Sequence, residues 1–365
     1  MIDNAQAPSY KIAKHLNKKL LYLNCLPHTY STKNSQELAE ELKSIQIKEQ
    51  MKINTLDIKD LCVNLPINGI TQTAKFWLNK NGNDRELMKQ TLYLLETILK
   101  QNYFQHNERL FQPEKGIAMG SPISSTMAEV YLQHIEEMYI KQWLDSKEIV
   151  YYRRYVGDIL IIYDQNRTNE LTILHHINTI DRNFQFKMST EENNTINYFH
   201  ISIHRNNNNT DLHIYGKPTS TDTTIHFSSN HHHEHKIAAV RHYIHRMIML
   251  PITEKSKQEE WKTILTIAKN NGYLLNIIKK LKIKLIAKKQ NQQLPTTLLH
   301  HKKWITFTYF SPIIRRITNQ FKHSNLKIAH RTTNTIQQQL TEKPTNTNPS
   351  GIYKLKCNTC DNVYV

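Results

Sequence analysis

The run from Tyr151 to Tyr163, YYRRYVGDILIIY, constrains the fold more than any other stretch of the chain. Two apolar, strand-like segments meet around Gly157 and Asp158, and a glycine beside an aspartate favours a tight hairpin that presents the carboxylate at its tip. An ordinary buried hairpin, in which the aspartate only caps the turn, would show the same pattern. The segments that precede this run in the chain decide between the two interpretations.

Two upstream segments carry residues of chemical interest in a particular order. Residues 56–61 (LDIKDL) form a strand-like segment that contains Asp57, and residues 115–124 (KGIAMGSPIS) form a glycine-rich loop before a helical pattern. A carboxylate strand, a glycine-rich loop and a carboxylate hairpin follow one another in the palm of template-directed polymerases. With these motifs the chain resembles the reverse transcriptases of Penelope-like retroelements. That family has Tyr-x-Asp-Asp at the hairpin, whereas residues 155–158 read YVGD.

The resemblance implies RNA-directed DNA synthesis with two Mg²⁺ ions, which lie about 3.5 to 4 Å apart in such sites. Mg²⁺ requires oxygen ligands at short distance, and Gly157 has no side chain that could supply one. We therefore expect Asp57 and Asp158 to be the catalytic and metal-binding residues of an impaired enzyme, with Asp60 pointing away. The alternative is a noncatalytic nucleic-acid-binding remnant that keeps the groove but not the metals.

The resemblance also assigns contacts to the template and the nucleotide. Family members carry an aromatic residue at the position of Cys62, where it excludes a 2′-hydroxyl, so the smaller cysteine predicts weak discrimination against ribonucleotides. Residues 198–203 (YFHISI) resemble the primer-gripping hairpin, with His200 in place of an acid. The predicted nucleotide- and template-binding residues are Cys62, Gln112, Gly116, Met119, Gly120, Ser121, Pro122 and Tyr155.

Charge points to the same class of partner. The formal net charge of +17 over 365 residues indicates a polyanion, because neutralising phosphates releases counterions and favours binding. We expect an RNA template, a DNA primer and deoxynucleoside triphosphates as partners. A run of lysines is often only a solvated face, but here we expect contacts to the nucleic-acid backbone from Lys279, Lys280, Lys282, Lys284, Lys288 and Lys289.

Hydrophobic periodicity predicts an α+β fold with a β-α-β-β-α-β alternation. The resemblance implies that this is a right-hand polymerase palm of ferredoxin-like topology with a helical, basic thumb. Helices are expected over 70–102, 119–143, 169–182, 237–248 and 261–289, and paired strands around 184–188 and 196–204. The predicted segments are 1–50 (residual fingers), 51–216 (palm), 217–290 (thumb), 291–350 (basic connector) and 351–365 (start of a nuclease domain). No long apolar span or signal peptide is evident, so we expect a cytoplasmic or nuclear protein.

Both ends of the chain fit a truncated copy of such an element. Residues 351–353 (GIY), with Cys357 and Cys360, resemble the opening of a GIY-YIG endonuclease, but the chain stops before the catalytic residues of that domain. Nuclease activity is therefore not expected. A single Cys-x-x-Cys is half a zinc site. The irregularly spaced histidines between His226 and His235 favour a polar loop over a metal site.

Overall fold

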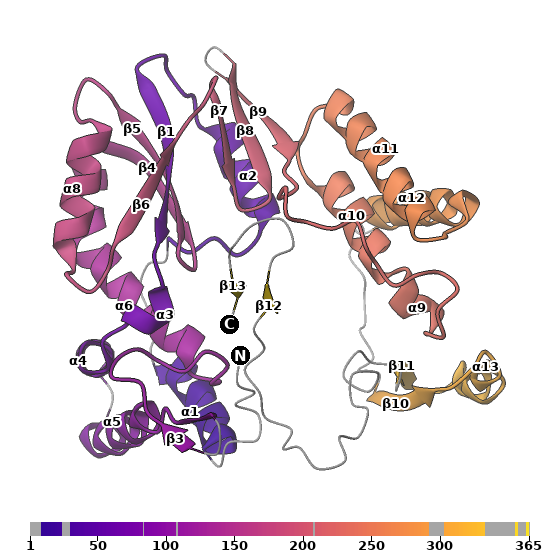
Figure 1. Ribbon diagram of the computed structural model, residues 1–365, viewed down its shortest axis with the longest axis horizontal. Helices are drawn as coiled ribbons and strands as arrows, with labels where there is room; N and C mark the ends of the chain where they lie inside the picture. The colour runs from indigo at the N-terminus through magenta and orange to yellow at the C-terminus, as the bar shows by residue number, and fades with distance from the viewer. Residues whose placement is uncertain are drawn as a thin grey trace.

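The computed structural model describes residues 9–23, 30–82, 84–106, 109–206, 209–291 and 303–332, with the strand residues 355–356 and 363–364. Its largest sheet is antiparallel, with strand order β4-β5-β1-β6 (Figure 1). The strands of this sheet, with the two helices that lie between them in the chain, follow in this order: β1 (Met51–Ile58), α6 (Ser124–Ile135), β4 (Ile149–Tyr155), β5 (Asp158–Asp164), α8 (Glu170–Ile180) and β6 (Phe186–Thr190). Their β-α-β-β-α-β order confirms the predicted ferredoxin-like palm.

The central strand β5 is buried on both faces, because its apolar residues are consecutive rather than alternating. Ile159 and Ile161 belong to one core, which includes residues of α6 and α8. Leu160 and Ile162 belong to the other, with residues of α2 (Ser35–Ser44) and of a second sheet. The palm is therefore a sheet covered on both sides, and only the ends of its strands are open to a site.

The second sheet corrects one prediction. Its strands β7 (Thr195–Tyr198), β8 (Ile201–Asn206) and β9 (Asn209–Ile214) form an antiparallel meander. The expected pairing of 184–188 with 196–204 is wrong, because β6 pairs with β1 and the segment 196–204 forms a hairpin with itself. Asn193 and Asn194 have φ values of 50° and 58°, and this left-handed turn leads the chain out of the first sheet.

Helices α1 (Tyr10–Leu23), α4 (Ile67–Lys80) and α5 (Arg85–Lys100) lie beyond the end of β1, with the hairpin of β2 (Phe104–His106) and β3 (Arg109–Phe111) (Figure 1). The single helix predicted over 70–102 is two helices. Gly82 adopts a φ of 69°, and the Asp84 side chain accepts a hydrogen bond from the Leu87 amide to begin α5. A glycine after one helix and an aspartate cap before the next are ordinary boundary signals.

The long helix predicted over 119–143 begins later, at Ser124. The Ser124 hydroxyl donates to the Ala118 carbonyl at 2.6 Å, and Gly120 has a φ of 96°, so the glycine-rich segment forms a turn before the helix. The helix then passes through a π-helical stretch, η2 (Glu136–Ile140), into α7 (Lys141–Asp145). Such π-helical insertions often occur at functional sites.

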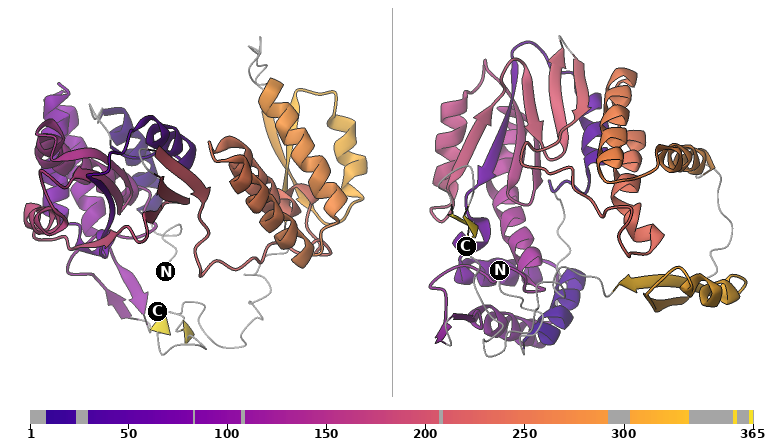
Figure 2. Two further views of the ribbon diagram at one scale, coloured as in Figure 1. Left: turned by 90° about the horizontal axis from the view of Figure 1, so that it is seen from above. Right: turned by 45° about the vertical axis from the view of Figure 1, so that its right-hand side comes forward.

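A third hydrophobic core holds the thumb helices α9 (His233–Lys236), α10 (Ala238–Met249), α11 (Glu254–Asn270) and α12 (Leu275–Asn291). In Figure 2 they lie to one side of the palm. The helix predicted over 261–289 is two helices separated at Gly272, whose φ is 76° and where a Cβ atom would lie 2.7 Å from His226 Nε2. Only glycine fits this turn between α11 and α12.

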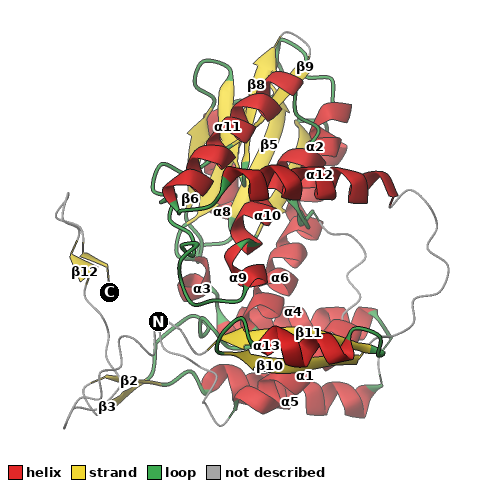
Figure 3. Ribbon diagram, turned by 90° about the vertical axis from the view of Figure 1, so that its right-hand side faces the viewer, coloured by secondary structure: helices red, strands yellow, loops and turns green. Residues whose placement is uncertain are grey.

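The predicted connector contains an ordered unit of two parallel strands. These are β10 (Lys303–Tyr309) and β11 (Leu326–Thr332), joined through α13 (Ile314–Thr318) and the 3₁₀-helix η3 (Asn319–Phe321) (Figure 3). Farther on, β12 (Leu355–Lys356) pairs with β13 (Val363–Tyr364). Residues 351–353, Cys357 and Cys360 lie outside the described residues. Among the helices that are described, none is long and apolar enough to cross a membrane.

Candidate active site

Asp57 and Asp158 face each other across neighbouring strands. They are direct partners in the β1–β5 register, and the Ile58 amide donates to the Gly157 carbonyl at 3.0 Å, so the pairing continues to the hairpin tip. Side chains of directly opposite residues leave the same face of a sheet with Cβ atoms about 4.5 to 5.5 Å apart. The expectation that these two carboxylates lie side by side is confirmed.

The two carboxylates interact electrostatically. Burial raises the pKa of Asp158, the charge of Asp57 raises it further, and Lys217 acts in the opposite direction. Lys217 lies just beyond β9, where the Tyr215 amide donates to the His200 carbonyl at 3.0 Å. The sequence analysis did not predict this lysine as a site residue. Its position depends on the pairing of β8 with β9, which brings a segment about sixty residues away to the hairpin tip.

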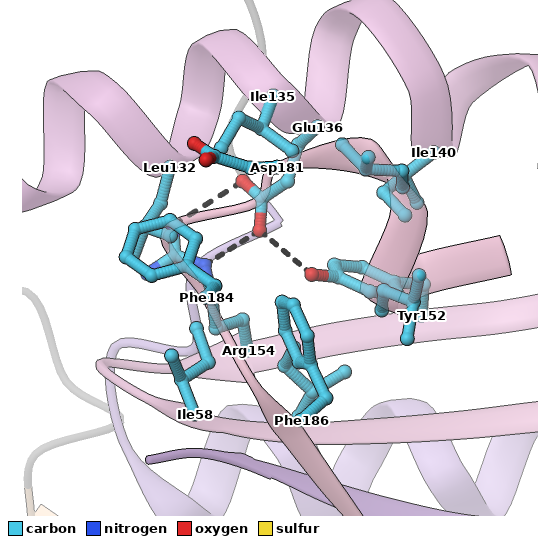
Figure 4. A pocket seen from close by; sticks show the side chains of 13 residues that line it. Ile58, Leu132, Ile135, Glu136, Ile140, Tyr152, Arg154, Asp181, Phe184 and Phe186 are labelled. Atoms are coloured by element: carbon cyan, nitrogen blue, oxygen red, sulfur yellow. Dashed lines mark hydrogen bonds and ion pairs between the residues drawn. The ribbon is translucent and has the colours of Figure 1, made fainter. Parts of the chain in front are cut away.

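The hairpin tip is held from behind by a buried arginine. Val156 has a φ of 56°, which is unusual for a β-branched residue, and Arg154 Nη1 donates to the Val156 carbonyl at 3.1 Å. The Arg154 side chain is 1% exposed and binds Glu136 through Nε at 2.6 Å. It also binds Glu129 in a bidentate pair at 3.0 Å. Figure 4 shows the arginine below Glu136, with Tyr152 donating to the same carboxylate.

This network was missed because its members are far apart in the sequence. Glu129 and Glu136 are seven residues apart on one helix, a spacing that puts both on one face. This spacing was the signal in the sequence that could have revealed the network. The buried partner of both glutamates is Arg154, the second arginine of YYRRY. Burial raises the pKa of Glu136, while Arg154 acts to lower it.

Position 157 has room for a side chain. A Cβ atom there would lie 3.7 Å from the Ile58 carbonyl oxygen and 3.8 Å from Leu61 Cδ2, both ordinary contacts. Gly157 is also not among the glycines with positive φ. An aspartate would therefore fit, with its carboxylate beside a backbone oxygen one residue from Asp57.

The donor set present fits one Mg²⁺ better than two. Among the described residues there is no group of three or more side chains that could hold a metal. Mg²⁺ is commonly bound through one or two carboxylates, with water and substrate phosphates completing its shell. Asp57 and Asp158 satisfy that minimum, and Gly157, beside Asp158 in the chain, supplies no third carboxylate.

A groove of about 820 Å³ opens beside the hairpin tip. It brings together four of the predicted contact residues, Cys62, Met119, Gly120 and Ser121, with Val156 of the tip. The opposite wall includes Ser31, Thr32 and Lys33, which the sequence analysis did not predict. This wall is fixed by backbone pairing, since the Thr32 amide donates to the Arg154 carbonyl at 2.7 Å. Burial raises the pKa of the Cys62 thiol.

Two further predicted contact residues, Gly116 and Gln112, also make contacts within the chain. Gly116 is buried with a φ of 85°, and a Cβ atom would lie 2.5 Å from the Val63 carbonyl oxygen, so this glycine allows the loop to pack on α3 (Leu61–Asn64). The Gln112 side chain donates to the Lys100 carbonyl at 2.8 Å, at the end of α5. Both residues therefore support the fold, and their contacts to template or nucleotide stay predictions. Asp60 begins α3 in the left-handed conformation, and its predicted orientation stays a prediction.

Tyr155 joins the palm hairpin to the primer-grip-like hairpin. Its ring lies 4.1 Å from that of Phe199, between centroids, and the Tyr198 hydroxyl donates to the Asp158 carbonyl at 3.1 Å. His200 follows in the same turn. Its pKa is lowered by burial and then by the charges of Arg246, which belongs to α10 of the thumb, and of Lys217.

Five of the six predicted backbone-binding lysines are exposed on α12, and Lys282 is the exception. Its ammonium lies 4.2 Å from the centroid of the Trp261 ring, a cation–π contact within the thumb. A groove of about 280 Å³ between α10 and α12 is lined by two of these lysines, Lys288 and Lys289. Arg241, His242 and His245 also line it and were not predicted.

Comparisons with known proteins bear on the thumb and on the whole fold. A family described as an animal helix-turn-helix domain matches residues 223–282, which span α9 to α11 and part of α12. No curated protein matches the chain. The solved structure of telomerase from Candida albicans, in complex with a fragment of telomeric RNA, has a TM-score of 0.54 at 11% identity. The match covers 79% of this chain and 54% of the telomerase chain, about half its length.

Two further structures are similar at a lower level. Telomerase from Candida tropicalis, also with a telomeric RNA fragment, has a TM-score of 0.47 at 12% identity, covering 79% of this chain and 51% of that one. The Sicinivirus 3Dpol RNA-dependent RNA polymerase has a TM-score of 0.43 at 7% identity, covering 69% and 54%. At such identities the Candida albicans match speaks for the fold alone. The chain has the palm-and-thumb fold of template-directed polymerases.

Proposed function

We propose that this chain is a reverse transcriptase of the Penelope-like type, an RNA-directed DNA polymerase whose catalysis is impaired by Gly157. The observation that carries the proposal is the direct pairing of Asp57 with Asp158 at the open end of a ferredoxin-like palm. Acids rarely pair directly across neighbouring strands, because like charges directly opposite destabilise a sheet. A repulsive pair of this kind is typical of a functional site.

In this proposal Asp57 and Asp158 hold Mg²⁺, which would supply electrostatic stabilisation to the primer oxygen and the triphosphate. The groove lined by Cys62, Met119 and Ser121 receives the template base and the incoming nucleotide. Tyr155 and the Phe199 turn support the primer end. The small side chain of Cys62 leaves space for a 2′-hydroxyl, so discrimination against ribonucleotides is weak.

The thumb binds the nucleic-acid backbone. Exposed lysines of α12 and the groove lined by Arg241, His242 and His245 form one basic surface, and Arg246 and His200 link it electrostatically to the palm. Because each phosphate contact contributes about 0.7 to 0.9 to the log–log salt slope, affinity for a primer–template should fall steeply as salt rises. Binding without salt dependence would exclude a phosphate-binding thumb.

One observation favours the second candidate, a noncatalytic nucleic-acid-binding protein. The described residues hold two carboxylates at the palm where the two-ion chemistry of the resembled family needs a third. Such a protein would keep the groove and the basic thumb and would bind Mg²⁺ weakly.

Metal titration separates the two candidates without requiring a complete polymerase. We expect weak Mn²⁺ binding by the chain as it is, measured by electron paramagnetic resonance, and clearly tighter binding by Gly157→Asp. Adding Asp57→Asn to Gly157→Asp should remove the gain. Gly216→Asp is a matched control, because a Cβ atom at Gly216 meets no atom within 4 Å, so this variant adds the same charge on an open loop.

Primer extension on an RNA template then completes the test. Extension by Gly157→Asp that Asp57→Asn abolishes would support an impaired polymerase. If Gly157→Asp gains no metal affinity over Gly216→Asp, the carboxylates do not form a metal site and the noncatalytic candidate holds.

A further inference from the structure

One face of the β10–β11 sheet carries mostly exposed side chains in the part of the chain that the structure describes. In the parallel register Trp304 pairs with Lys327 and Thr308 with Arg331. Because alternate residues of a strand share a face, six residues form what we call the open face: Trp304, Thr306 and Thr308 of β10, with Lys327, Ala329 and Arg331 of β11.

The opposite face of the sheet is covered by protein. Phe307 contacts Phe321 of η3, with ring centroids 5.8 Å apart. His330 stacks on His232 at 3.7 Å, and Tyr309 contacts the same histidine at 5.3 Å, which docks the unit on the loop before α9. His232 is therefore a buried docking residue, although the sequence analysis expected a polar loop there. Covering one face leaves the other free for a ligand.

The open face combines an aromatic ring with cations. Trp304 is 64% exposed, although large apolar side chains usually avoid water. The Lys327 ammonium lies 5.3 Å from the centroid of its ring, and Lys327 and Arg331 are themselves exposed. Thr306 and Ala329 have small side chains, so a flat base could approach the sheet closely between the Trp304 ring and Arg331.

The sequence around this unit carries positive charge only. From residue 261 to residue 341 the chain has fifteen lysines and arginines and no aspartate or glutamate. A solvated charged surface normally mixes both signs. A segment with cations alone, next to an exposed tryptophan, is complementary to a polyanion that offers flat aromatic faces.

We propose that the open face of β10 and β11 is a binding site for single-stranded nucleic acid, separate from the palm and from the thumb groove. An unpaired base stacks on Trp304, and the adjacent phosphates contact Lys327 and Arg331. Duplex is disfavoured because its bases are already stacked on each other. The distance along β10 from Trp304 to Thr308 is about 13 Å, enough for only a few nucleotides. The inference does not rest on polymerase activity.

Ultraviolet crosslinking of the full chain to a ten-nucleotide oligouridylate, in buffer with EDTA, tests the site directly. Mass spectrometry should find crosslinks on the peptide that carries β10. Trp304→Ala should reduce the crosslinked fraction at this peptide, and weaken binding at this site about 5- to 100-fold, as expected for loss of base stacking. Trp304→Phe should restore most of it, because phenylalanine retains a ring.

Matched variants on the same unit provide the controls. Lys327→Gln with Arg331→Gln should lower the salt slope at this site by about 1.4, at roughly 0.7 for each phosphate contact of a single strand. Arg316→Gln and Ile317→Ala change exposed residues of α13, away from the open face, and should have no effect. Crosslinks confined to the palm and thumb, unchanged binding by Trp304→Ala, or equal competition by duplex would overturn the proposal. None of these outcomes would alter the Mn²⁺ titration of Gly157→Asp.

Discussion

Replacement of Arg154 by methionine removes the cation behind the hairpin tip and keeps a side chain of similar length. It leaves Glu136, whose side chain is 3% exposed, without its charged partner. It also removes the donor to the Val156 carbonyl. The neighbouring Arg153 is a natural control, because its bidentate pair with Glu41 lies at the surface, with side chains 28% and 29% exposed.

The expected loss follows from burial. Breaking a buried ion pair by removing one partner costs about 3 to 5 kcal/mol, and the hydrogen bond to the strained turn contributes about 1 kcal/mol more. The free energy of unfolding should therefore fall by roughly 4 to 6 kcal/mol, a large part of the total for a domain. At about 2 to 4 °C per kcal/mol, the midpoint falls by about 8 to 24 °C. Arg153→Met should cost about 1 kcal/mol.

The loss should also depend on pH in a defined direction. Burial already raises the pKa of Glu136, and Arg154 opposes that rise, so the variant holds a proton on Glu136 well above the unfolded value of about 4.3. Its folded state then binds more protons than the unfolded state, and its stability falls as pH rises. The difference from the natural chain should be larger at pH 8 than at pH 5.

Guanidinium unfolding followed by circular dichroism at both pH values measures these effects. Adding Glu136→Gln to Arg154→Met should remove the pH dependence and recover part of the loss at pH 8. If Arg154→Met and Arg153→Met lose the same small free energy at both pH values, Arg154 does not hold the hairpin tip through a buried charge.

Two further predictions concern residues of the palm. Asp158→Asn should raise the melting midpoint by about 2 to 4 °C above pH 6, because it removes repulsion from Asp57 worth about 1 kcal/mol between partly exposed groups. Since the pKa of Asp158 is raised in the fold, that benefit should disappear as pH falls below the unfolded value of about 3.9, as a fluorimetric melt at pH 7.5 and pH 3.5 would show. Gly116→Ala should cost about 2 to 4 kcal/mol, because it forces a Cβ atom within 2.5 Å of the Val63 carbonyl oxygen at positive φ. Gly216→Ala should be neutral in the same denaturant titration, since nothing lies within 4 Å of its Cβ position.

The palm could be predicted because its signals are local. An apolar run broken by glycine and aspartate specifies the β4–β5 hairpin, and the order of motifs specifies the topology around it. The partner of β6 could not be predicted in the same way. Residues 184–188 and 196–204 have similar strand patterns, and the left-handed turn at Asn193 and Asn194 decides which sheet each joins.

The residues of the candidate site fall into the same two groups, those marked by local sequence patterns and those that only the fold places there. Motifs identified Asp57, Asp158 and the groove residues Cys62 and Ser121, because each lies within a few residues of a recognisable pattern. They did not identify Lys217, which reaches the hairpin tip only through tertiary packing. They also did not identify Arg154, whose partners Glu129 and Glu136 lie on other elements of the fold. A glycine in a motif shows that a backbone approaches something closely, without showing what. At Gly116 the partner is the chain's own backbone.

At position 157 the requirements of metal binding and those of folding are independent of each other. A Cβ atom there would meet no atom closer than 3.7 Å, and the position needs no positive φ, so the backbone does not require glycine. The two preceding residues are held by contacts of their own. The ring of Tyr155 contacts Phe199, and the Val156 carbonyl accepts a hydrogen bond from the buried Arg154. An exchange between aspartate and glycine at position 157 is therefore expected to leave the architecture intact, and an intact architecture says nothing about metal chemistry. For this reason thermal stability cannot distinguish the impaired polymerase from the binding protein, whereas the affinity of Gly157→Asp for Mn²⁺ can.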